Sequence, residues 1–79
     1  IEYPRRALER SWQGNVRLSV TVDRAGAVQE VVVIEESKHS TLTKAAVKAT
    51  KKASPFPGMP KEISGNSFTF TLPVVFKLN

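Results

Sequence analysis

In the final segment of the chain, residues 68–78, every second side chain is apolar, and the residues between them include one proline. The apolar set is Phe68, Phe70, Leu72, Val74, Phe76 and Leu78. An alternation of period two predicts a strand with one buried face. Proline cannot donate a ladder hydrogen bond and is found at sheet edges or bulges. Pro73 therefore predicts that one side of this strand is unpaired.

An unpaired strand edge has two interpretations. If Pro73 faces the open side, Thr69, Thr71 and Val75 direct their main-chain groups there too, because alternate residues point to opposite sides. Such an edge can receive an extended peptide by strand addition. Alternatively, Pro73 and Lys77 protect the edge against aggregation. Both interpretations share one geometry, and the residues alone do not separate them.

Two further strands are predicted near the start of the chain. Val16, Leu18, Val20 and Val22 alternate with polar residues, and residues 23–26 carry the Asp and Gly of a turn. The next run is rich in β-branched residues but alternates imperfectly, since Val28 and Val31 are three apart. A bulge or twist there would place Val28, Val31 and Val33 on the inner face.

Two helices complete the predicted fold. Pro4 suits the first position of a short helix that ends before Gly14, and Ser40 or Thr41 can cap a second helix that runs to about Ala53. We expect an apolar stripe of this second helix to face the sheet, made of Leu42, Ala45, Ala46, Ala49 and Ala53. The prediction is an α+β domain covering residues 1–79, α-β-β-α-β in order, with a three-stranded antiparallel sheet and both helices packed on one face.

The chain carries a net charge of +5, which raises nucleic acid or an anionic surface as a partner. Cationic charge also keeps a small domain soluble. Binding to single-stranded nucleic acid uses exposed aromatic residues among basic ones. The four phenylalanines are expected in the core or at its rim, and Trp12 is expected to pack a helix on the sheet. Because few aromatic residues are expected to be exposed among the basic ones, we favour solubility over nucleic-acid binding as the role of the positive charge.

The sequence lacks the residue sets of an active site. His39 is the only histidine, lies in a predicted loop and has no metal-binding partner nearby, and there is no cysteine. Glu35 and Glu36 are adjacent on a strand and point to opposite faces. The isolated glycines form no phosphate-binding loop. We therefore expect a domain that is not an enzyme and holds no metal or cofactor.

No stretch of the sequence reaches the roughly 20 apolar residues that span a bilayer, and no signal peptide is present. The chain begins at an isoleucine. We therefore expect it to be part of a longer protein whose membrane anchor lies elsewhere.

The order of motifs from Tyr3 to Leu78 resembles the C-terminal domain of TonB. The motifs are YPRRA, G-x-V-x-L-x-V-x-V, D-x-x-G-x-V, L-x-x-A-A, F-P and L-P-V-x-F. The resemblance implies the periplasmic domain of an energy transducer anchored in the Gram-negative inner membrane. Such a protein couples the ExbB–ExbD proton-motive complex to outer-membrane transporters for siderophores, cobalamin or similar cargo.

The resemblance also implies a binding site. The TonB box, a short extended segment of the transporter, would add to the sheet beside the last strand. The strand residues concerned are Thr69, Phe70, Thr71, Leu72, Pro73, Val74, Val75 and Phe76. Arg6 would approach the transporter. A TolA-like or other envelope interaction module remains an alternative, as does a homodimer formed by strand exchange.

Overall fold

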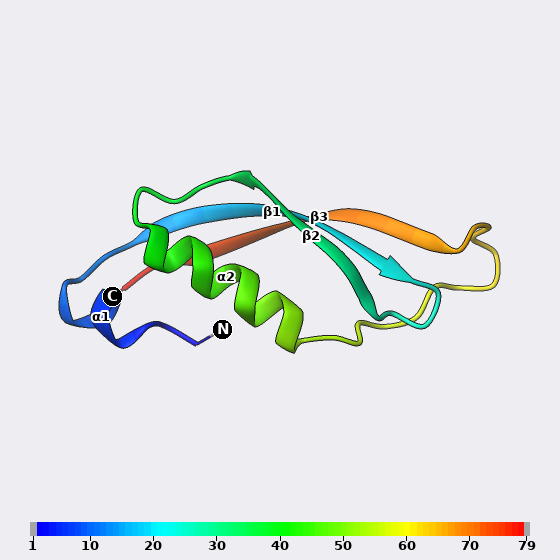
Figure 1. The fold of residues 1–79 in the computed structure, drawn as a ribbon, viewed down its shortest axis with the longest axis horizontal. Helices are drawn as coiled ribbons and strands as arrows, with labels where there is room; N and C mark the ends of the chain where they lie inside the picture. Colours follow the sequence, from blue (N-terminus) through cyan, green and yellow to red (C-terminus); the bar gives the residue numbers. More distant parts are fainter. Residues whose placement is uncertain (1, 79) are drawn as a thin grey trace.

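The computed structural model describes residues 2–78 and has the predicted order of elements. These are α1 (Arg5–Glu9), β1 (Gly14–Asp23), β2 (Val28–Glu35), α2 (Ser40–Lys52) and β3 (Ser67–Phe76). The strands form one antiparallel sheet in the order β2-β1-β3, and both helices lie on the same side of it (Figure 1). The predicted α+β architecture is therefore confirmed. Within the described residues, neither helix is long and apolar enough to cross a membrane.

The core lies between the sheet and the helices. Its buried apolar side chains come from every element except β2: Ala7, Val16, Leu18, Val20, Val22, Leu42, Ala46, Val74 and Phe76. On β1 the buried positions are the even-numbered ones, as the alternation predicts. The central strand thus supplies four of the nine buried apolar residues and anchors the domain.

The predicted irregularity of the second strand is confirmed as a bulge. Thr21 pairs with Glu30 and Val22 pairs with Val28, so Gln29 is an extra residue on β2. The bulge lets Val28 join Val31 and Val33 against the core. A second register shift, between Arg17 and Leu18 on β1, was not predicted.

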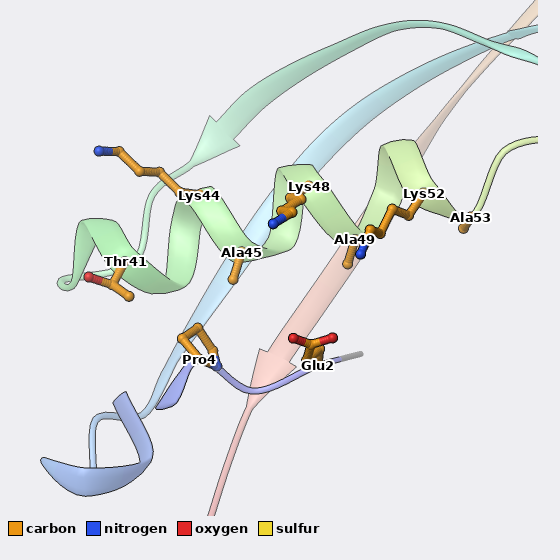
Figure 2. Close-up of a pocket in the computed structure, with 9 residues that line it drawn as sticks. All are labelled: Glu2, Pro4, Thr41, Lys44, Ala45, Lys48, Ala49, Lys52 and Ala53. Atoms are coloured by element: carbon orange, nitrogen blue, oxygen red, sulfur yellow. The ribbon is translucent and has the colours of Figure 1, made fainter. Parts of the chain in front are cut away.

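The buried stripe of α2 differs from the expected alanine stripe. Leu42, Ala46 and Thr50 are buried, whereas Ala49 is only half-buried and Ala53 is exposed. Thr50 tolerates burial because its hydroxyl donates to the Ala46 carbonyl at 2.8 Å. A groove of about 520 Å³ lies between α2 and the N-terminal segment at Glu2 and Pro4, and its lining includes Ala45, Ala49 and Ala53 (Figure 2).

The start of α2 also differs from expectation. The N-cap is His39 rather than Ser40 or Thr41, and its carbonyl accepts the Leu42 N–H at 3.0 Å. The His39 ring is not a solvated loop side chain but stacks on Trp12, with ring centroids 4.5 Å apart and planes 9° apart. Trp12 therefore packs the segment after α1 against the start of α2. Sequence spacing could not show this contact, because the two residues are 27 positions apart.

Candidate peptide-binding edge

The sheet has two outer strands, and they differ in regularity. β3 pairs with β1 from Ser67 to Phe76 without a register shift. β2 is interrupted by two shifts and carries Glu30 and Glu35. Bulges and charges are the usual means of blocking a strand edge. β3 has no register shift, and Pro73 is the one position from Thr69 to Val75 where its outer edge lacks a donor, so β3 is the better template for an added strand. The prediction that the last strand is an edge is confirmed.

Two observations orient the main chain of β3. Pro73 faces Arg17 in a ladder without a bulge, so its missing N–H disturbs no pairing. On β1, the Asp23 N–H donates to the Ala27 carbonyl at 2.9 Å, which points Asp23 toward β2. By alternation, odd-numbered residues of β1 bond to β2 and even-numbered ones bond to β3. The Arg17–Pro73 pair is thus not hydrogen-bonded, and the main-chain groups of Pro73 face the open edge.

The same alternation directs the N–H and C=O groups of Thr69, Thr71 and Val75 outward, together with the Pro73 carbonyl. A side-chain contact supports this orientation. The hydroxyl oxygens of Thr21 and Thr69 lie 2.8 Å apart. Side chains approach more closely in non-hydrogen-bonded pairs, which is the assignment that alternation gives to this pair.

The eight strand residues predicted as a binding site divide into two sets of different exposure. Thr69, Thr71, Pro73 and Val75 are exposed, with Val75 at 63%. Their neighbours point to the inner face, where Phe70 and Leu72 are half-buried and Val74 and Phe76 are buried. The first set can offer main-chain groups and open-face side chains to a peptide, and the second set fixes the strand on the core.

Arg6 lies on α1 and is exposed. The segments flanking α1 are tied to the end of β3. The Tyr3 ring meets the Phe76 ring edge-on with centroids 5.3 Å apart, and the Leu78 N–H donates to Gln13 Oε1 at 2.8 Å. The Tyr3 hydroxyl also donates to the Trp12 carbonyl. Arg6 therefore belongs to the segment held at the C-terminal end of the β3 edge.

A small apolar cavity lies at the other end of β3 and was not predicted from the sequence. Its walls include Met59 and Ile63 from the loop between α2 and β3, and Phe68 and Phe70 from the strand. The available signal was a loop rich in proline and glycine that nevertheless carries Phe56, Met59 and Ile63.

No group of three or more His, Cys, Asp or Glu side chains is placed to hold a metal ion anywhere in residues 2–78. What the β3 edge offers instead is a row of main-chain donors and acceptors, which is the chemistry of peptide recognition.

Three kinds of comparison with known proteins agree. The family model described as Gram-negative bacterial TonB protein C-terminal matches residues 1–78. Protein tonB2 of Pseudomonas aeruginosa is 37% identical over 78 residues, which are 99% of this chain and 28% of that protein. The chain thus spans little more than a quarter of this relative's length.

The solution structure of the Helicobacter pylori TonB C-terminal domain is similar to this chain with a TM-score of 0.79 and 25% sequence identity. The similarity covers 99% of this chain and 69% of that one. The sequence matches and the structural match each cover almost the whole of this chain. The chain belongs to the TonB C-terminal domain family.

Proposed function

We propose that this chain is the periplasmic interaction domain of a TonB-type energy transducer and that the outer edge of β3 binds the TonB box of outer-membrane transporters. The observation that carries the proposal is the regular, unpaired edge of β3, where Thr69, Thr71 and Val75 direct N–H and C=O groups outward and Pro73 directs its C=O group outward. An added strand would hydrogen-bond to these groups, and such bonds depend little on the peptide's side chains.

The proposed biological role follows from membership of the family. A membrane helix outside this chain would anchor the protein in the inner membrane and meet the ExbB–ExbD complex. The domain would then couple the proton-motive force to the uptake of siderophores, cobalamin or similar cargo. Residues 1–79 would act as one domain, with Arg6 approaching the transporter at the C-terminal end of the β3 edge.

A bound peptide of this kind contacts only one strand edge, so the interface is small and the complex transient. The same edge could pair with a second copy of the chain. A dilution series by analytical ultracentrifugation, run with and without peptide, separates these states, because peptide and second copy compete for β3.

The test is an NMR titration of the ¹⁵N-labelled domain with a TonB-box-like peptide and, separately, with a single-stranded oligonucleotide, each at two salt concentrations. We expect salt-tolerant amide shifts along residues 69–75, with Pro73 silent because it has no N–H. An opposing result is a set of shifts confined to Arg5, Arg6, Arg10 and residues 44–52, caused by the oligonucleotide and abolished by salt. That result would replace peptide capture with nucleic-acid binding.

A further inference from the structure

A small apolar cavity lies at the N-terminal end of β3, on the inner face of the sheet. Its volume is about 220 Å³. Its lining includes Met59, Ile63, Phe68 and Phe70, together with Phe56 and Val22. Two of these side chains remain accessible, since Phe68 is 44% exposed and Ile63 is 39% exposed. The cavity is therefore open to an incoming group.

The loop that forms one wall of the cavity is held in place. The Arg24 guanidinium donates to three carbonyls of this loop, to Ile63 at 2.7 Å, Gly65 at 2.5 Å and Pro60 at 3.1 Å. The Arg24 carbonyl accepts the Met59 N–H at 3.0 Å. Figure 1 shows this loop, drawn in yellow, lying beside the turn that joins β1 to β2. The cavity is thus formed before any ligand arrives, which reduces the entropy lost on binding.

The cavity adjoins the proposed binding edge. Phe68 and Phe70 belong to β3 and pack together, with ring centroids 6.0 Å apart, and Phe70 meets the Phe56 ring at 5.6 Å. A strand added to β3 would place the residue opposite Phe68 or Phe70 on the same inner face. The next residue of the peptide would point to the open face instead. Only every second peptide side chain can therefore reach the cavity.

The opposite end of β3 is packed differently. Val74 and Phe76 are each 2% exposed, so the inner face there is already filled by the core. Leu72 is half-buried but does not line the cavity, so among the inner-face residues of β3 only Phe68 and Phe70 border it. A volume of about 220 Å³ is below the roughly 300–1,000 Å³ typical of small-molecule sites and suits a single side chain.

We propose that this cavity is a specificity pocket, which accepts one aromatic or branched aliphatic side chain of the peptide that adds to β3. This inference rests on the proposed function, because the peptide strand must pair with β3 before its side chain can enter. The lining is apolar, and the Arg24 guanidinium is already bound to carbonyls. A carboxylate or ammonium group would lose its hydration there without gaining a partner.

The chain has no cysteine, so a disulfide tether can fix the peptide's register. The Lys77→Cys variant, at the C-terminal end of the edge, forms a disulfide with a peptide of threonine and serine that carries one cysteine. One peptide series has the cysteine at its N-terminus and a second series has it at its C-terminus, so that both strand directions are tested. A single phenylalanine or alanine is moved along the peptide one position at a time. The tethering equilibrium against a free thiol gives the affinity, and amide shifts of β3 show whether the peptide pairs with the edge.

Methyl signals report entry into the cavity. Met59 is the only methionine, and Ile63 can be compared with Ile34, which is 54% exposed on β2 and outside the cavity lining. We expect phenylalanine at alternate positions to shift the Met59 and Ile63 signals but not Ile34, and to favour tethering about tenfold over alanine. Ile63→Ala should remove most of that gain, and Ile34→Ala should leave it unchanged.

The outcomes separate the two proposals. Amide shifts along β3, combined with Met59 and Ile63 methyl shifts at alternate phenylalanine positions, support both peptide capture by the edge and the specificity pocket. Shifts along β3 without any alternation in the Met59 and Ile63 signals overturn the specificity pocket and leave peptide capture by the edge intact. An absence of shifts along β3 with every peptide, free or tethered, overturns the proposed function and the pocket with it.

Discussion

Thr21 and Thr69 face each other across the β1–β3 ladder with their hydroxyl oxygens 2.8 Å apart. The contact places both side chains on the face of the sheet that the helices leave open. It also marks the Thr21–Thr69 pair as a close, non-hydrogen-bonded pair, whose main-chain groups on the β3 side point to the free edge. One side-chain contact thus reports the register on which the proposed binding site depends.

A double-mutant cycle should detect this contact. Thr21→Ala, Thr69→Ala and the double variant are expected to show a coupling of about 0.2–1 kcal/mol in the free energy of unfolding. Chemical denaturation supplies the measurement, and Thr21→Ser is the control because it keeps the hydroxyl. A coupling of zero would mean that the two hydroxyls do not meet in solution.

Proline substitution at neighbouring positions should distinguish the two sides of β3. Thr71→Pro removes an outward donor, so peptide binding should weaken severalfold, by about 0.5–1.5 kcal/mol, while the domain stays folded. Leu72→Pro removes a bond to β1 and should destabilise far more than Leu72→Ala does. Peptide titration and thermal melting measure the two effects. Unfolding of Thr71→Pro would show that Thr71 faces β1.

Gly26 is expected to tolerate no side chain. Its φ is +94°, and an added Cβ would lie 1.7 Å from the Phe56 carbonyl oxygen. Gly26→Ala should therefore cost at least about 2 kcal/mol in the free energy of unfolding, from backbone strain and steric overlap together. Gly65 is the matched control, because its φ is +99° but its nearest contact is 3.9 Å away. Equal losses in urea melts of the two variants would argue against the overlap at Phe56.

Enlarging two alanines of α2 should affect stability to different extents. Ala46 is fully buried, so Ala46→Leu overpacks the contact with the sheet and should cost about 1–3 kcal/mol. Ala49 faces the groove in Figure 2, and Ala49→Leu should change stability by no more than about 0.5 kcal/mol. Guanidinium titration of both variants gives the comparison. A neutral Ala46→Leu would place that residue outside the core.

Arg24 should govern the order of the loop between α2 and β3. Its planar guanidinium reaches three carbonyls, a geometry that the ammonium of lysine does not reproduce. We expect Arg24→Lys to speed hydrogen exchange in residues 59–66 and to leave exchange in β1 unchanged. Arg17→Lys, at an exposed position on β1, is the control. Unaltered exchange in the loop would show that the three bonds do not hold it.

Short-range patterns in the sequence were sufficient for the elements and their order. Alternation identified β1 and β3, and the spacing of Val28 and Val31 predicted a bulge or twist, which the structure shows to be a bulge at Gln29. Pro73 identified β3 as an edge strand. Each of these inferences depends on backbone periodicity or on a missing N–H, which are properties of a few adjacent residues.

The tertiary structure alone decided which side chains meet across long separations. On α2 the core takes Thr50 rather than Ala49, because burial depends on how the helix lies against the sheet and not on its sequence spacing alone. The stacking of His39 on Trp12, and the bonds from Arg24 that shape the cavity beside Phe68, likewise join distant segments. Sequence determines local periodicity directly, whereas these contacts exist only after the sheet has brought the segments together.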